Sequence, residues 1–176
     1  MDLSWRYDRW YRRLPSSPRD EGRVERLVLR VPGEEGTRET PDRAQVEAQG
    51  LVGDKWSSDP EAPDGTQVSL INVNVARAVA EGDDARSPLC GDNLHVDLDL
   101  SEQNLPVGAR LEVGSVVLEV SEVPHRPCRS FLARFGATNA KRVARAGRQG
   151  LRGRGVLCRV LQPGEVRVGD AIRVRR

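Results

Sequence analysis

The segment Leu94–Leu100 alternates strictly between apolar and polar residues, and this pattern restricts the fold more than any other in the chain. Successive side chains of a β-strand point to opposite faces, so the leucines and Val96 would share one face. Such a strand has one buried and one solvated face. The polar residues His95, Asp97 and Asp99 would line the second face. They could hold a cation, but a solvated strand face has the same pattern, and we expect the solvated face.

Other short segments have the composition of strands, with turn residues between them. Strands are predicted at residues 27–31, 68–71, 111–113, 116–120 and 155–161, and around residues 166 and 172–174. Short helices are predicted at residues 41–49, where Thr40 would be the N-cap and Pro41 the first helical residue, and at residues 74–81. The chain has no internal repeat and no regular βαβ spacing. It therefore predicts a mostly β fold, a closed or nearly closed antiparallel β-barrel with a few short helices.

The chain divides into an N-terminal arm, residues 1–20, and a body, residues 21–176. A length of 176 residues suits one compact domain. The arm holds four of the seven aromatic residues, interleaved with arginines, and Pro15 and Pro18 separate it from the body. Such residues could stack on a nucleic-acid base or on a partner. An arm of this kind more often packs its rings over its own fold, which we expect here.

The composition excludes several classes of protein. Hydrophobic residues make up 38% and charged residues 31% of the chain, and no apolar run approaches the roughly 18 residues of a membrane helix. The first residues contain no apolar signal-peptide core. Cys90, Cys128 and Cys158 are an odd number without C-x-x-C spacing, which argues against a disulfide framework and a structural zinc site. We expect a cytoplasmic protein without membrane contact.

The net charge of +2 hides an uneven distribution. Residues 141–176 contain 11 Lys/Arg and 2 Asp/Glu, whereas the preceding residues contain 17 Lys/Arg and 24 Asp/Glu. This division indicates either an anion site or two surfaces that attract one another on folding. We favour the second interpretation, because the arginines are spread over turns and strands.

Cys128 is the main candidate for chemistry. Pro127 suits the first position of a helix, which would place Cys128 in the first turn, where the helix dipole favours a thiolate. Arg126, Arg129 and His125 lie close in sequence and would act in the same direction. A lowered thiol pKa produces a nucleophile or a metal ligand, whereas a free cysteine can also be buried and inert. The same segment predicts a helix that stops at Gly136.

The other two cysteines are expected to have packing roles. Cys158 would share a strand face with Val156 and Val160, and Cys90 lies at a turn. Two glycine turns offer polar side chains to a ligand: Lys55 could hold a phosphate, and Asn93 could bind a heterocycle. Such turns in barrels are also commonly structural.

A series of ordered motifs resembles the MOSC domain, the C-terminal domain of molybdenum-cofactor sulfurases, in its stand-alone bacterial form. The matching segments are Gly50–Trp56 (G-x-x-G-D), Gly91–Leu94 (G-[DE]-N-L), Val107–Gly114 (V-G-x-x-L-x-[IV]-G), His125–Cys128 (R-x-P-C), Gly153–Val156 (R-G-[VI]) and Pro163–Asp170 (P-G-x-[VI]-x-x-G-D). They cover roughly residues 50–174. The chain departs from one large subgroup at residues 64–69, where that subgroup has H-G-G-x-x-[KR].

The resemblance implies a barrel like that of pyruvate kinase and a working cysteine at Cys128. In the family this cysteine is thought to carry sulfur as a persulfide or to ligate molybdenum, and some members reduce N-hydroxylated compounds. His125 would orient the site or move a proton. The residues expected to hold the phosphate and heterocycle of the cofactor are Lys55, Asn93, Arg126, Arg129 and Arg154. Pyridoxal phosphate would enter only through a partner cysteine desulfurase, and a molybdoenzyme is the other expected partner.

A second hypothesis is a binding module in which the cysteine is incidental. Its arginine-rich C-terminal quarter and aromatic arm would hold an anionic ligand or nucleic acid. We favour a small-molecule ligand over nucleic acid. In the first hypothesis Cys128 lies at the mouth of a cleft, and Asn93, Arg126 and Arg129 line that cleft.

Overall fold

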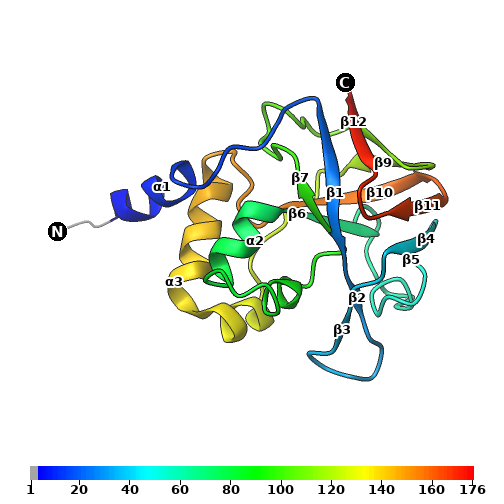
Figure 1. Ribbon diagram of the computed structural model, residues 1–176, viewed down its shortest axis with the longest axis horizontal. Coiled ribbons are helices and arrows are strands. Elements are labelled where there is room, and N and C mark those ends of the chain that lie inside the picture. The colour runs from blue at the N-terminus through cyan, green and yellow to red at the C-terminus, as the bar shows by residue number, and fades with distance from the viewer. Residues whose placement is uncertain (1–3) are drawn as a thin grey trace.

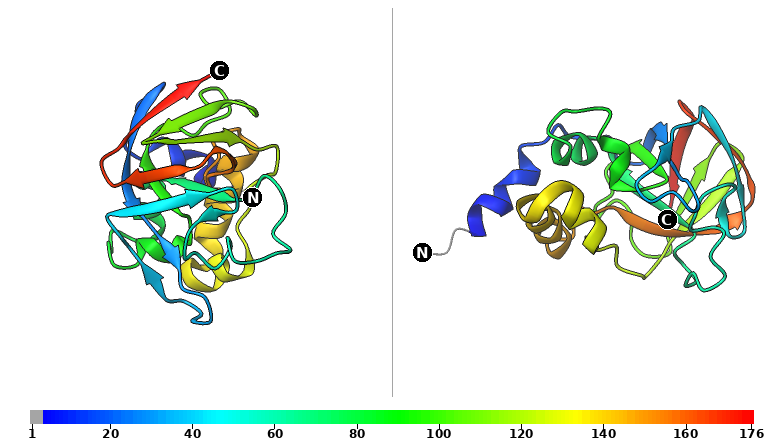
Figure 2. Two further views of the ribbon diagram at one scale, coloured as in Figure 1. Left: turned by 90° about the vertical axis from the view of Figure 1, so that its right-hand side faces the viewer. Right: turned by 90° about the horizontal axis from the view of Figure 1, so that it is seen from below.

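The computed structural model describes residues 4–176, in which seven strands form a closed barrel and the helices gather at one end of the molecule (Figure 1; Figure 2, right). Around the barrel the order is β1-β12-β8-β9-β10-β6-β7. These strands are β1 (Glu21–Leu27), β6 (Val68–Asn72), β7 (Leu94–Asp97), β8 (Arg110–Val113), β9 (Val116–Val120), β10 (Val156–Gln162) and β12 (Ala171–Arg175). The predicted mostly β barrel is confirmed. One neighbouring pair, β6 and β7, is parallel, and the other pairs are antiparallel.

Two small sheets and four helices complete the structure. The small sheets consist of β11 (Gly164–Arg167), β4 (Arg43–Glu47) and β5 (Gly50–Leu51), and of β2 (Leu29–Arg30) with β3 (Arg38–Glu39). The helices are α1 (Ser4–Arg12), α2 (Val73–Val79), α3 (Arg129–Arg148) and the 3-10 helix η1 (Ser87–Cys90). None of the helices among residues 4–176 is long and apolar enough to cross a membrane.

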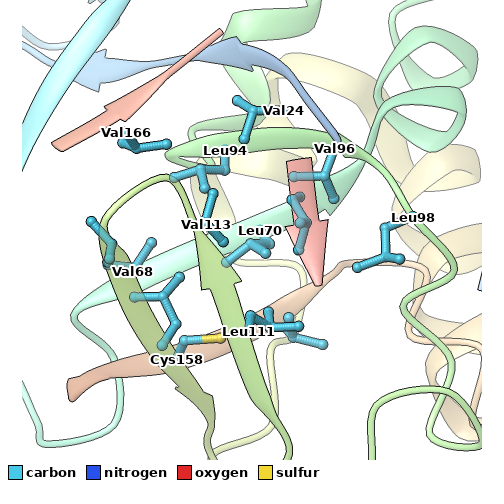
Figure 3. Packing of buried hydrophobic residues seen from close by; sticks show 14 of the residues in the cluster. Val24, Val68, Leu70, Leu94, Val96, Leu98, Leu111, Val113, Cys158 and Val166 are labelled. Atoms are coloured by element: carbon cyan, nitrogen blue, oxygen red, sulfur yellow. The ribbon is translucent and has the colours of Figure 1, made fainter. Parts of the chain in front are cut away.

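The core fills the barrel and continues under the helices. Side chains from the strands meet inside the barrel, as Figure 3 shows for Leu70, Leu94 and Val96. A second cluster joins Ile71 of β6 to apolar residues of α2 and α3, including Phe131. The helical end is therefore attached to the barrel through an apolar interface.

The helix predicted at residues 41–49 is wrong, because this segment contains the strand β4. Ala44 and Val46 are buried, while the residues beside them in β4 are exposed. β4 pairs with β11, where Ala44 faces Val166, and also with β5. This alternation and the pairing outweigh the helix-start signal of Pro41.

The solvated strand face predicted around His95 is also incorrect for that residue. Leu94, Val96, Leu98 and Leu100 are all buried as expected. His95 is buried as well, because α2 packs against β7 at this point of the barrel. No cluster of three or more His, Cys, Asp or Glu residues that could hold a metal ion occurs in the described part of the chain.

The N-terminal arm packs on its own fold, as expected. α1 contacts α3, and Trp10, Tyr11 and Leu14 pack against the second core cluster. The guanidinium of Arg142 lies 5.7 Å from the centre of the Trp10 ring. Trp5 remains half exposed.

The basic C-terminal quarter makes ion pairs with acidic residues from the rest of the chain, in agreement with the second interpretation of the charge distribution. Five arginines among the described residues join the two parts: Arg154 pairs with Asp92, Arg159 with Asp64, Glu119 and Glu122, Arg173 with Glu21, Arg175 with Glu112, and Arg176 with Asp20. These arginines are paired with carboxylates of the same chain, whereas a nucleic-acid-binding surface would need them to contact phosphates.

Candidate functional site

A cavity of about 380 Å³ lies beside Cys128, and we call it the cysteine cavity. Its walls come from the β2–β3 hairpin, the loop after β5, η1, the segment before α3 and the first turns of α3. Its charged lining residues are Arg30, Arg38, Lys55, Arg126, Arg134, Arg154, Glu34 and Glu35. The excess of cations makes the cavity suited to an anionic ligand.

Cys128 immediately precedes α3 and is the N-cap residue, with φ −91° and ψ 177°. The expectation that it lies in the first helical turn is therefore wrong by one residue. Its carbonyl accepts a hydrogen bond from the Leu132 amide at 3.0 Å, and its side chain makes no capping hydrogen bond. Pro127 fits the extended backbone that enters the helix and is not its first residue. The thiol is exposed and lines the cavity.

The first segment of α3 ends at Gly136, as the sequence predicts, but a second helical segment follows directly. Gly136 has φ 79° and ψ 164°, which breaks the helix and produces a kink. The short segment carries Cys128 at its start and Ser130 and Arg134 in the cavity wall. Ser130 and Arg134 are four residues apart, so they lie on the same helical face.

The other two cysteines are packed, as expected. Cys158 lies within the barrel core and Cys90 in the second cluster (Figure 3). Burial raises the pKa of both thiols to about 12. Cys128 is thus the exposed cysteine of the protein.

We expect iodoacetamide to modify native Cys128 at least about a hundredfold faster than Cys90 or Cys158 at pH 8. A thiol with a pKa near 12 is ionised in only about one molecule in ten thousand at this pH, and the thiolate is the species that reacts. Mass spectrometry of peptides against time measures the three rates. All three cysteines should react in urea. Equal rates in the native protein would contradict the reactive role of Cys128.

Arg154 forms the floor of the cavity and is nearly buried, with 5% of its surface exposed. Its Nη1 donates to Oδ2 of Asp92, and its Nη2 donates to the Cys90 carbonyl at 2.9 Å. The guanidinium lies 4.9 Å from the centre of the Phe131 ring. Gly155, which follows it, has φ 97°, and a Cβ there would come 2.0 Å from the Leu70 carbonyl oxygen. Only glycine therefore fits between Arg154 and β10.

His125 and Asp92 lie against each other at the edge of the cavity. His125 Nδ1 is 3.5 Å from Asp92 Oδ1, and neither atom has a hydrogen-bond partner among the described residues. Burial raises the pKa of Asp92, and the Arg154 cation opposes this shift. Burial lowers the pKa of His125 well below its usual value, and the cations Arg154 and Arg30 add to that effect. His125 is therefore a neutral imidazole at neutral pH.

A second buried carboxylate organises the wall formed by β2 and the loop after β5. Asp54 accepts hydrogen bonds from the Arg30 amide at 2.7 Å and from Arg30 Nε at 3.0 Å. Arg30 lies 5.8 Å from the centre of the Trp56 ring, whose Nε1 donates to Thr66 Oγ1 at 3.0 Å. The Lys55 amide donates to the Arg30 carbonyl at 2.8 Å, which leaves the Lys55 side chain exposed at the rim.

Arg38 of β3 pairs with Arg30 in the same hairpin, and Arg134 of α3 adds a further cation to the lining. Arg134 Nη1 donates to the Leu89 carbonyl at 3.3 Å, and its Nη2 lies 3.9 Å from Glu35 Oε1. Burial lowers the pKa of Arg38, and the nearby Arg134 and Arg30 cations lower it further. Such crowding of like charges around one cavity is unfavourable without an anion.

Two predicted site residues do not line the cavity. The Asn93 side chain is buried beneath it, where Oδ1 accepts hydrogen bonds from the amide and hydroxyl of Ser69 at 3.1 and 3.2 Å, and Nδ2 donates to the Val28 carbonyl at 3.4 Å. Arg129 is exposed outside the lining. The expectation that Asn93 and Arg129 line the cleft of Cys128 is therefore wrong. Asn93 follows Asp92 and Arg129 follows Cys128 in sequence. The Asn93 side chain is nevertheless buried in the fold, and the Arg129 side chain is exposed outside the cavity.

The structure does bring together Cys128, His125, Lys55, Arg126 and Arg154, as predicted. Sequence reasoning missed three cations that also line the cavity: Arg30, Arg38 and Arg134. The four-residue spacing from Ser130 could have indicated Arg134. The positions of Arg30 and Arg38 depend on the β2–β3 hairpin, which no sequence pattern predicted.

The model of the MOSC domain family matches residues 60–173. The chain belongs to the MOSC domain family. Among solved structures, it is similar to the YuaD protein of Bacillus subtilis, with 20% identity, a TM-score of 0.64, and coverage of 90% of this chain and 97% of that chain. It is also similar to YiiM of Escherichia coli, with 19% identity, a TM-score of 0.57, and coverage of 88% and 70%. No curated protein sequence matches the chain.

The MOSC match contains part of the cysteine cavity and not all of it. The matched residues include Asp92, His125, Cys128 and Arg154. One wall of the cavity lies outside the match, because its residues come earlier in the sequence: Arg30, Arg38, Lys55 and Trp56. At these identities, the likeness to YuaD and YiiM shows the MOSC fold and does not show a shared ligand.

Proposed function

We propose that the protein binds molybdenum cofactor in the cysteine cavity, with Cys128 as a sulfur ligand of the metal. The observation that carries this proposal is an exposed thiol on a cavity lined by six Lys/Arg side chains. The cofactor is an anionic pterin with a phosphate, and membership of the MOSC family supports its choice over other anions.

The donors in the cavity fit this group. Thiolates are soft ligands that bind transition metals, and arginine binds phosphate through two parallel hydrogen bonds. Arg38 and Arg154 each retain a buried Nε without a partner among the described residues. Lys55 and Arg126 are exposed at the rim, where they can contact a phosphate. A volume of about 380 Å³ lies within the range of small-molecule sites.

When bound, the cofactor would supply two-electron redox chemistry, such as the reduction of N-hydroxylated compounds. The residues of the chain would hold and orient it. Asp92 fixes Arg154 at the floor, and the Asp54–Arg30 pair fixes the wall. His125 is neutral because burial lowers its pKa, so it would orient a ligand at the cavity edge through a hydrogen bond.

A second candidate function is sulfur transfer, which the exposure of Cys128 favours. A Cys128 thiolate would attack the terminal sulfur of a donor persulfide, and the donor cysteine would leave as a thiolate. The donor would be a cysteine desulfurase, which would itself hold the pyridoxal phosphate, and the acceptor would be a molybdoenzyme. An exposed thiol is needed in this reaction, because two proteins must meet at the sulfur.

Measurements of bound molybdenum and pterin test the proposal. Protein purified from a host that makes the cofactor should contain close to one molybdenum atom and one pterin per protein chain. The Cys128→Ser variant should lose most of the molybdenum, because an alcohol is a poor replacement for a thiolate ligand. Cys158→Ala, a change at a buried cysteine, is the matched control and should retain it.

The outcomes separate the two candidate functions. A wild-type protein without metal and pterin, but with one additional sulfur atom on Cys128 by mass spectrometry, would support sulfur transfer. Absence of metal, pterin and persulfide would contradict both functions.

A further inference from the structure

A second cavity, of about 670 Å³, lies next to the cysteine cavity, and we call it the valine cavity. The two cavities share a wall, because His125, Arg126 and Leu157 line both. The other walls come from the second segment of α3 and from the start of β10. Apart from the shared residues His125 and Arg126, the lining of this space has no part in the proposed function.

The valine cavity has an apolar part beside its polar and charged lining residues. Val143 of α3 and Val156 of β10 are buried, and Val107 and Val123 extend the same surface. Ala144 and Gly147 leave room beside them, because small side chains face the space. An apolar ring or short hydrocarbon placed here would be removed from water, which stabilises binding.

The rim of this cavity carries cations that the protein does not neutralise. Arg126 and Arg148 have no hydrogen-bond or ion-pair partner within the part of the chain that the structure describes. The two acidic residues of the rim are already near cations. Glu122 accepts hydrogen bonds from Arg159 at 3.2 and 3.4 Å. Glu102, the second acidic residue, lies near Arg152. Burial lowers the pKa of Arg152, and the Glu102 carboxylate acts in the opposite direction.

Arg152 already has partners in the protein and is not free to turn toward a ligand. Its Nη1 donates to the carbonyls of Leu100 and Leu105, which holds the side chain against the loop between β7 and β8. The uncompensated charge of the rim therefore comes from Arg126 and Arg148. An apolar body next to two free guanidinium groups is complementary to one kind of small molecule.

We propose that the valine cavity binds an amphipathic organic anion. Its apolar or aromatic body would contact the valines, and its carboxylate, sulfonate or phosphate would contact Arg126 and Arg148. The proposal concerns binding and does not rest on the function proposed for Cys128.

Binding of 8-anilinonaphthalene-1-sulfonate tests the proposal, because this fluorescent probe has an aromatic body and one anionic group. The native wild-type protein should bind one probe per chain. Arg148→Glu should raise the Kd at least about tenfold, since the change removes a charge-assisted hydrogen bond and places a like charge beside the sulfonate. Arg43→Glu makes the same charge change on β4, away from the cavity, and should change the Kd less than about twofold.

Two further variants locate the probe. Ala144→Trp should abolish binding by filling the cavity, with circular dichroism to confirm that the variant is folded. Lys55→Glu alters only the cysteine cavity and should bind normally, as should Cys128→Ser. An unchanged Kd in Arg148→Glu, or an equal loss in Lys55→Glu, would overturn the proposal. Loss of cofactor in Cys128→Ser with normal probe binding would separate the two sites.

Discussion

Replacing Arg154 with methionine should lower the free energy of unfolding by about 3–5 kcal/mol, because the change leaves the Asp92 carboxylate buried without its cation. Urea unfolding of the two proteins measures the difference. The matched control is Arg175→Met. Arg175 pairs with Glu112, but both side chains are largely exposed, so the control should leave the free energy of unfolding nearly unchanged.

The loss in the Arg154→Met variant should depend on pH in a defined direction. Burial raises the pKa of Asp92, and the variant removes the cation that opposes this shift. A carboxyl whose pKa is raised in the folded state contributes stability at low pH and loses it as the pH rises. The deficit relative to wild type should therefore be larger at pH 8 than at pH 5. A double variant with Asp92→Asn should be less destabilised than the sum of the single changes. Additive losses would show that the two side chains do not act as a pair.

The barrel could be predicted from the sequence because its strands depend on local patterns. The apolar positions of Leu94–Leu100 and the glycine turn between β8 and β9 are visible in a few consecutive residues. The structure confirms the turn and the burial of the four apolar residues, although the strand itself ends at Asp97. β4 was missed for the opposite reason. Its five residues contain only two apolar side chains, and their pairing partners in β11 lie about 120 positions away. A Thr-Pro helix start was the stronger local signal.

The cavity was predicted only in part, because motif residues and cavity residues are different sets. Cys128 and His125 could be found from their neighbours in sequence. Asn93 belongs to a motif because it ties β6 to the turn before β7, which is a structural task. Arg30 and Arg134 reach the cavity from elements that are about 100 residues apart. Their approach depends on tertiary packing, which local patterns do not contain.

The burial of His95 also depends on tertiary packing that the local sequence pattern does not contain. Its position between Leu94 and Val96 places it on the outer face of the barrel, as alternation requires. Whether that face is solvated or buried depends on α2, which packs against β7. Both ring nitrogens are buried without a hydrogen-bond partner among the described residues. The histidine is therefore a source of acid sensitivity and is not a ligand on a solvated face.

Lowering the pH from 6.5 to 5 should reduce the free energy of unfolding by about 2 kcal/mol through His95 alone. Burial lowers the pKa of His95 from 6.5 to about 3, and the cations Arg26, Arg154 and Arg77 oppose protonation, while Asp84 favours it. In this range the unfolded chain binds a proton that the folded chain does not, so stability falls by about 1.4 kcal/mol per pH unit. His125, whose pKa is also lowered by burial, should add to the slope.

The variant His95→Leu should remove the part of this slope that belongs to His95. Leucine replaces two unpartnered polar atoms with hydrocarbon, so stability at pH 7 should be kept or raised, and the gain over wild type should grow toward pH 5. Urea unfolding at several pH values measures the slopes, and Arg175→Met, which touches neither histidine, should show the wild-type slope. An unchanged slope in His95→Leu would mean that the folded protein accommodates a charged His95.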